Sequence, residues 1–130
     1  MTTVLFACVH NAGRSQMAAA LFNALIDPAK ATAISAGTEP SDRVHPEVVE
    51  VMKEIGIDLS QTKPKQLTDE LARQAHVLIT MGCGDSCPVV LGLKRYDWPL
   101  PDPKGQPLEK VREIREEIRG RILEFMMPSP

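Results

Sequence analysis

The sequence lacks several features that would assign it to a specialised class. Its 130 residues include three cysteines, and an odd number does not suit a framework of structural disulfides. No apolar run approaches the length that crosses a membrane, and the N-terminus has neither the basic region nor the apolar length of a secretory signal. The net charge of −2 argues against broad electrostatic binding of nucleic acid. We therefore expect a cytoplasmic protein that binds neither nucleic acid nor membrane.

What is present is the composition of an ordinary globular domain. Hydrophobic residues make up 43% of the chain and charged residues 25%, without internal repeats. A chain of this length can bury a real core, so we expect one domain over residues 1–130, acting as a monomer. The cysteines could be reactive thiols, metal ligands or inert buried thiols. Cys83 and Cys87 have no histidine close in sequence, so no metal site is predicted.

Short apolar stretches alternate with helical patterns along the chain. Strands are predicted at Thr3–Ala7, Ala31–Ala36, His76–Met81 and Lys94–Trp98. Helices are predicted from Gly13 to Asp27-Pro28, at Pro46–Ile55, at Thr68–Gln74 and at Leu108–Phe125, where Arg112, Glu116 and Arg119 form the solvated face. This alternation predicts an α/β fold of three layers: a four-stranded parallel sheet with helices on both faces.

The loop CVHNAGRS, from Cys8 to Ser15, joins the first strand to the first helix. Such a loop presents backbone N–H groups and a helix N-terminus, which together form an anion site. Gly13 permits a sharp path into the helix, and the fork of Arg14 suits a tetrahedral oxyanion. The same positive field favours the thiolate of Cys8, to which Ser15 can donate a hydrogen bond. The loop therefore predicts a nucleophile beside an oxyanion clamp.

Two other segments with unusual chemistry follow predicted strands. They are Gly82–Cys87, with two cysteines, and Pro99–Pro103, with Asp102. Ligands of parallel α/β sheets bind at the carboxyl ends of the strands, so we expect these segments close to Cys8.

These motifs together resemble the low-molecular-weight tyrosine phosphatase superfamily. Cys-x5-Arg-Ser at the first strand-to-helix junction and the late Asp102-Pro103 match that superfamily. Its arsenate reductase branch is resembled over nearly the whole chain, in NAGRSQMA (Asn11–Ala18), SAGTEP (Ser35–Pro40), VHPEVVEVMKEIGIDLS (Val44–Ser60), VLITMGCGDSCP (Val77–Pro88) and YDWPLPDPKGQ (Tyr96–Gln106). The resemblance implies a low-molecular-weight phosphatase-like fold.

The resemblance also implies an enzyme that reduces arsenate to arsenite. Cys8 would attack arsenate, and Asp102 would protonate the departing oxygen. Cys83 would then release arsenite and form a disulfide with Cys8, and Cys87 would move that disulfide to Cys83–Cys87. Arsenate, with phosphate or sulfate as mimics, would bind on the loop residues Val9, His10, Asn11, Ala12, Gly13, Arg14 and Ser15.

The resemblance leaves the electron donor open, and no cofactor is expected to be bound. Thioredoxin is favoured as the reductant, while some relatives use mycothiol or glutathione with a matching redoxin. Relatives with the thioredoxin relay separate their two later cysteines by a longer insert than the three residues between Cys83 and Cys87. Certain members bind potassium through a glutamate of the first helix, where this chain has Ala19, so a potassium site is doubtful.

Two alternatives remain beside arsenate reduction. A phosphatase of phosphotyrosine or small esters would also use Cys8, Arg14 and Asp102, but would not need the later cysteines. One Tyr, one Trp and three Phe give little material for an aromatic slot, and Trp98 is expected to pack beneath the Asp102 loop. A non-catalytic anion-binding or redox-sensing module is the other alternative. No catalytic or ligand-binding role is assigned to the side chains of the histidines. We expect His10 to be exposed, His45 to pack at a helix start and His76 to be structural.

Overall fold

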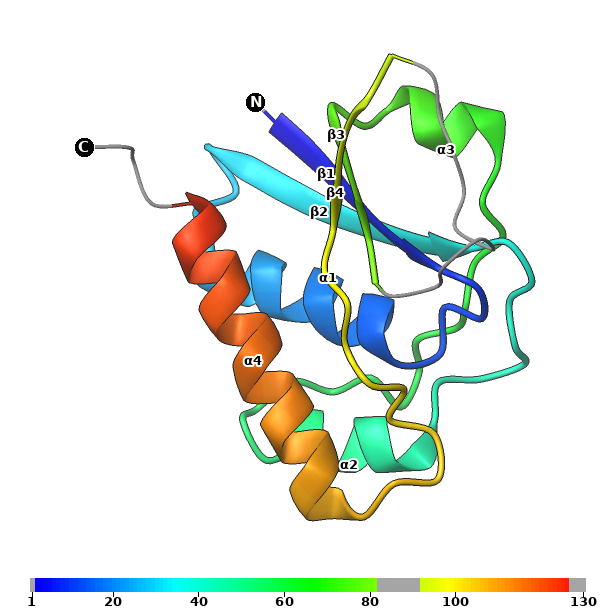
Figure 1. Ribbon diagram of the computed structural model, residues 1–130, viewed down its shortest axis with the longest axis vertical. Helices are drawn as coiled ribbons and strands as arrows, with labels where there is room; N and C mark the ends of the chain where they lie inside the picture. Colours follow the sequence, from blue (N-terminus) through cyan, green and yellow to red (C-terminus); the bar gives the residue numbers. More distant parts are fainter. Residues whose placement is uncertain (1, 82–91, 127–130) are drawn as a thin grey trace.

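A parallel sheet forms the centre of the computed structural model, which describes residues 2–81 and 92–126. Its strands lie in the order β2-β1-β3-β4. They are β1 (Thr2–Cys8), β2 (Ala31–Gly37), β3 (Val77–Thr80) and β4 (Lys94–Asp97), and the helices are α1 (Arg14–Leu25), α2 (Pro46–Lys53), α3 (Asp69–Arg73) and α4 (Leu108–Met126) (Figure 1). Each predicted element is present with slightly different ends, and the α/β prediction is confirmed.

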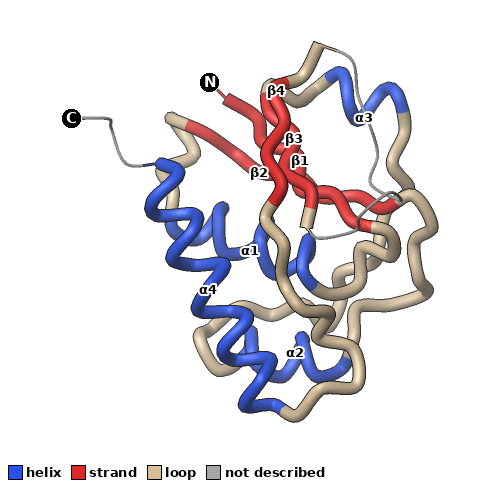
Figure 2. Tube along the Cα trace, viewed as in Figure 1, coloured by secondary structure: helices blue, strands red, loops and turns tan. Residues whose placement is uncertain are grey.

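The helices cover the sheet from both sides, as the alternating side chains of β1 require. Val4, Phe6 and Cys8 face a large core shared with α1, α2 and α4. Leu5 and Ala7 face a smaller core that Ala72 of α3 closes, so α3 lies on the opposite face of the sheet from α1, α2 and α4 (Figure 2). Because β1 is buried on both faces, its sequence is a continuous apolar run rather than an alternating one.

All five aromatic side chains of the chain, three Phe, one Tyr and one Trp, pack into a single connected group. Trp98 lies at its middle, with ring centroids 5.6 Å from Phe6 and 6.1 Å from Phe125. Tyr96 contacts Phe125, and Phe22 contacts Phe6. Trp98 is buried directly after β4, where the Asp102 loop begins. The aromatic residues therefore stabilise the core and the base of that loop.

Two details of α2 and α4 differ from the sequence-based prediction. Helix α2 ends at Lys53, so Ile55 does not join its apolar face and is 42% exposed in the turn that Gly56 completes at φ +83°. Arg112 does not lie on a purely solvated face, because it donates to both carboxylate oxygens of Glu54. Arg115, buried in α4, donates to the same carboxylate and to the carbonyl of Val51. These contacts join α2 to α4.

In the part of the chain that the structure describes, no helix combines the length and the apolar character needed to span a bilayer.

Candidate active site

Cys8 is the last residue of β1, and its side chain is buried just before α1 begins. Its Sγ lies 2.9 Å from Oγ of Ser15 and accepts the backbone N–H of Asn11 at 3.2 Å. Asn11 has a φ of +50°, a left-handed conformation that asparagine tolerates better than most residues. This conformation turns the backbone so that the amide of Asn11 reaches back to the sulfur.

A chain of hydrogen bonds fixes the direction of the Ser15 proton. The backbone N–H of Lys65 donates to Oδ1 of Asn11 at 2.9 Å, which sets the orientation of that side-chain amide. Nδ2 of Asn11 therefore donates to Oγ of Ser15, at 2.8 Å. A hydroxyl that accepts this bond still has its own proton, which can point to the sulfur of Cys8. Two donors, one backbone and one hydroxyl, thus converge on Cys8.

The backbone carbonyls of the loop point away from the site. The segment that follows β2 donates to them from the backbone N–H groups of Thr38, Glu39, Ser41 and His45, which bind the carbonyls of Cys8, Val9, His10 and Ala12 at 2.8–3.3 Å. The carbonyl of Asn11 accepts from Nε2 of Gln16 at 3.0 Å. Because a trans peptide places the next N–H opposite the carbonyl, the amides of this loop are turned toward the other side. This arrangement forms an anion cradle.

Gly37 and Gly13 are glycines because other groups approach them closely. A Cβ on Gly37 would lie 2.5 Å from the carbonyl oxygen of Val9, in the cradle itself. A Cβ on Gly13 would lie 2.7 Å from Cγ of Pro103 and 3.2 Å from Cδ2 of His45. The φ of Gly13 is −139°, outside the left-handed region, so close approach is the clearer reason for glycine there.

The Asp102 loop reaches the site from β4 and is tied to the start of α1. Nη1 of Arg14 donates to the carbonyl of Leu100 at 2.8 Å. Oδ1 of Asp102 accepts the backbone N–H of Lys104 at 3.0 Å, which holds the carboxyl in a local turn. Arg14 thus holds the loop with one N–H and has other N–H groups in its fork for an anion.

One small cavity, of about 30 Å³, brings most of the expected residues together. It is lined by Cys8, Val9, His10, Ala12, Gly13, Arg14, His45 and Asp102. Asn11 and Ser15 are buried and reach Cys8 through the bonds described above. Among the described residues that line the cavity there is no Phe, Tyr or Trp. Cys83 and Cys87 lie outside the described residues.

His45 is the lining residue that sequence reasoning missed, because it was interpreted as packing at a helix start. It directly precedes α2 as the N-cap residue, but its half-buried side chain also lines the Cys8 cavity. Burial lowers the pKa of His45 from its ordinary value, against the opposite influence of the nearby carboxylates of Glu47 and Asp102. The only signal in the sequence was its place directly before Pro46 in a segment that follows a strand.

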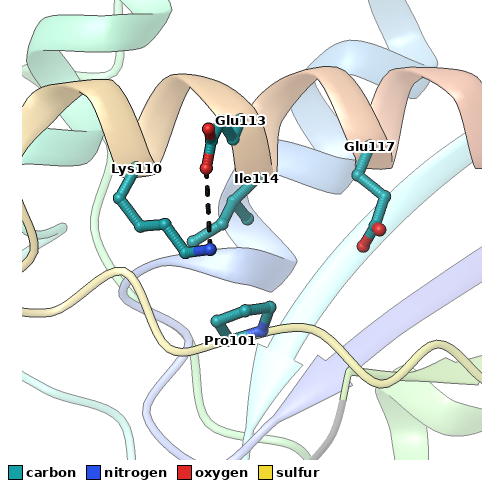
Figure 3. Close-up of a pocket in the computed structure, with 5 residues that line it drawn as sticks. All are labelled: Pro101, Lys110, Glu113, Ile114 and Glu117. Atoms are coloured by element: carbon teal, nitrogen blue, oxygen red, sulfur yellow. Dashed lines mark ion pairs between the residues drawn. The ribbon is translucent and has the colours of Figure 1, made fainter.

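Other cavities among the described residues are not lined by Cys8. One, of about 170 Å³, lies between Pro101 and the first turns of α4, where Lys110 and Glu113 form an ion pair at 3.5 Å (Figure 3). Another, of about 230 Å³, is lined by Ala19 together with Lys63 and Lys65. Both are larger than the Cys8 cavity, so size does not identify the active site here.

Known proteins share this combination of fold and loop. The model of the family described as low molecular weight phosphotyrosine protein phosphatase matches residues 3–128. The chain belongs to that family. Its described strand order is thus the fold of a family member, as the sequence predicted.

Several relatives in this family have arsenate reductase in their names. A "Putative arsenate reductase" of Halobacterium salinarum is 40% identical over 126 residues, which cover 92% of this chain and 87% of the relative. A "Glutaredoxin arsenate reductase" of Synechocystis is 36% identical over 125 residues, or 94% of each chain. The structure of a thioredoxin-dependent arsenate reductase from Corynebacterium glutamicum superposes with a TM-score of 0.78 and 44% identity. That match covers 96% of this chain but 60% of the other.

Proposed function

We propose that the protein is an arsenate reductase, which converts arsenate to arsenite. The observation that carries this proposal is the small cavity that joins Cys8, Arg14 and Asp102, in a chain with two more cysteines; none of the described residues that line it is aromatic in the sense of Phe, Tyr or Trp. Arsenate is tetrahedral and anionic, and it matches the cradle of amides and the guanidinium of Arg14. The names of the relatives support this substrate.

In the first step, the thiolate of Cys8 forms a bond to arsenic. The N–H of Asn11, the hydroxyl of Ser15 and the N-terminus of α1 stabilise this thiolate before the attack. One hydroxyl of arsenate departs as water, with the proton that Asp102 supplies. Arsenic remains As(V) in this adduct, so no electron has yet been transferred.

In the second step, the thiolate of Cys83 attacks the sulfur of Cys8. The electron pair of the S–As bond goes to arsenic, which leaves as arsenite, As(III), while a Cys8–Cys83 disulfide forms. Cys87 then attacks Cys83 and releases the thiolate of Cys8. Support comes from the sheet register, since Thr80 of β3 pairs with Ala7 next to Cys8, so the chain leaves β3 at the same edge of the sheet.

An external dithiol must reduce the Cys83–Cys87 disulfide to complete the cycle. We favour thioredoxin, because the relative from Corynebacterium glutamicum is thioredoxin-dependent. The name of the Synechocystis relative includes glutaredoxin, so a monothiol with its redoxin is the competing donor. Steady-state arsenate reduction by the purified protein, measured with thioredoxin, with glutathione and glutaredoxin, and with mycothiol and mycoredoxin, separates these donors.

Cysteine variants test the reaction itself. Cys8→Ser is expected to abolish arsenate reduction and any ester hydrolysis, because both need this nucleophile. Cys83→Ser and Cys87→Ser are expected to abolish arsenate turnover and to leave weak hydrolysis of p-nitrophenyl phosphate unchanged. Unimpaired arsenate reduction by Cys83→Ser would refute the internal relay and favour direct attack by a small thiol. Efficient hydrolysis of the ester without arsenate reduction by the wild-type protein would identify a phosphatase instead.

A further inference from the structure

His45 is held against the anion cradle by its backbone. Its N–H donates to the carbonyl of Ala12 at 2.8 Å, and its carbonyl accepts the N–H groups of Val48 and Val49 in the first turn of α2. Pro46 at the start of that helix restricts the backbone further. The side chain of His45 therefore starts from a fixed point at the rim of the Cys8 cavity.

The imidazole ring of His45 lines the Cys8 cavity close to Gly13. Its Cδ2 would lie 3.2 Å from a Cβ on Gly13, and Pro103, next to Asp102, approaches the same glycine from the other loop. His45 and the Asp102 loop thus flank the start of α1 from two sides. The space left between them, about 30 Å³, is on the order of two water-sized spheres. An inorganic oxyanion needs little room beyond the cradle. The substituent of a phosphate ester needs additional space outside the cradle.

Burial favours a neutral ring for His45 at neutral pH. Burial lowers its pKa most, and Lys104 and His10 act in the same direction, while Glu47 and Asp102 raise it. A neutral imidazole has one N–H donor and one acceptor nitrogen. It can donate to an oxygen of the substrate without adding a positive charge next to the carboxyl of Asp102.

We propose that His45 is a specificity-determining residue, whose ring hydrogen-bonds the outward oxygen of the bound oxyanion and fills the space that an ester substituent would need. This inference rests on the proposed arsenate reduction for its substrate. It assigns the preference for inorganic arsenate over phosphate esters to a residue before α2, outside the Cys8–Ser15 loop.

Three substitutions separate the hydrogen bond from the volume. His45→Ala removes both, and should raise the KM for arsenate about tenfold with kcat changed less, since one hydrogen bond to an anion is lost. It should also raise kcat/KM for p-nitrophenyl phosphate several-fold. His45→Phe retains the volume without the hydrogen bond, so it should still exclude the ester but should raise the KM for arsenate as His45→Ala does. His45→Asn restores the arsenate KM in part while admitting the ester. Arg43→Ala, in the same loop, serves as the control with wild-type values.

The outcomes distinguish this inference from the proposed function. If the wild-type protein fails to reduce arsenate, the proposed function is wrong, and arsenate inhibition of p-nitrophenyl phosphate hydrolysis still measures oxyanion binding in each variant. Parallel loss of both activities in all three variants would show that His45 is only structural. Unchanged arsenate KM and unchanged ester hydrolysis in His45→Ala would overturn the inference outright.

Discussion

The two loops that meet at Cys8 are held in place in different ways. The Cys8–Ser15 loop is held by hydrogen bonds from distant segments, including Lys65 and the residues after β2. The Asp102 loop contains prolines at 99, 101, 103 and 107, and it is anchored by the buried side chains of Trp98 and Leu100. Proline restricts φ without any partner, so this second loop is stiff through its own sequence. The position of Cys8 thus depends on contacts from several distant segments, whereas that of Asp102 depends more on its own segment.

This difference predicts that damage to the acid changes activity alone. Asp102→Asn should lower kcat for arsenate about a thousandfold, because general acid catalysis typically contributes 10²–10⁴-fold. The unfolding free energy and the binding of phosphate should stay close to the wild-type values, since the side chain is exposed and its hydrogen bond is a local one, from the backbone N–H of Lys104. Steady-state kinetics, urea unfolding and phosphate titration measure the three quantities.

Asp42→Asn, another exposed carboxyl in a loop, is the matched control and should behave as wild type. A marked loss of stability in Asp102→Asn would contradict the comparison, because it would show that the acid loop is also part of the supporting framework.

Damage to the cradle should instead change activity and stability together. In Gly37→Ala the new methyl group meets the carbonyl of Val9 at 2.5 Å, so the backbone of one segment must move. We expect a loss of about a hundredfold in kcat/KM from the displaced loop. The unfolding free energy should fall by about 1–3 kcal/mol, as overpacking usually costs. Kinetics and urea unfolding are measured on the same preparation.

Gly120→Ala tests whether the space at Gly37 is the cause. No atom lies within 4 Å of a Cβ at Gly120 in α4, so alanine should stabilise the helix by up to about 1 kcal/mol and leave kinetics unchanged. Equal effects of the two substitutions would refute the argument from close approach.

A smaller effect is expected where only one bond of the cradle is removed. Ser15→Ala deletes the hydroxyl that lies 2.9 Å from the sulfur of Cys8. Loss of one hydrogen bond to the thiolate should lower kcat about tenfold, while the backbone N–H of Asn11 still reaches the sulfur. Single-turnover formation of the arsenate adduct is the appropriate measurement. An unchanged rate would mean that the N–H of Asn11 and the N-terminus of α1 are enough to stabilise the thiolate of Cys8.

The contrast between local segments and contacts from distant segments also explains which features could be predicted from the sequence. Cys8, Arg14 and Asp102 were found because each lies in a local motif after a strand, and the rule for parallel sheets brings such loops together. Other contacts join residues that are far apart in the chain. Lys65 donates to Asn11, and His45 lies near Asp102. Periodicity and spacing describe neighbours along one element, so they do not reveal such contacts. The close approach at Gly37 and the place of His45 in the cavity lining therefore needed the structure.

The contact between α2 and α4 gives the smallest predicted effect and a reference outside both loops. Arg112 and Arg115 lower the pKa of Glu54 from its ordinary 4.5 to about 2. A carboxyl with a depressed pKa contributes stability above its unfolded value, and this contribution is lost as the pH falls. The urea midpoint of the wild type should therefore decline between pH 4.5 and about 2 more steeply than that of Glu54→Gln.

Arg112→Leu should flatten the decline as well, because it removes the largest cause of the lowered pKa of Glu54, and neither variant should alter kcat at neutral pH. A wild-type slope in both variants would show that this ion pair does not contribute, and a change in kcat would show that α2 and α4 act on the cradle.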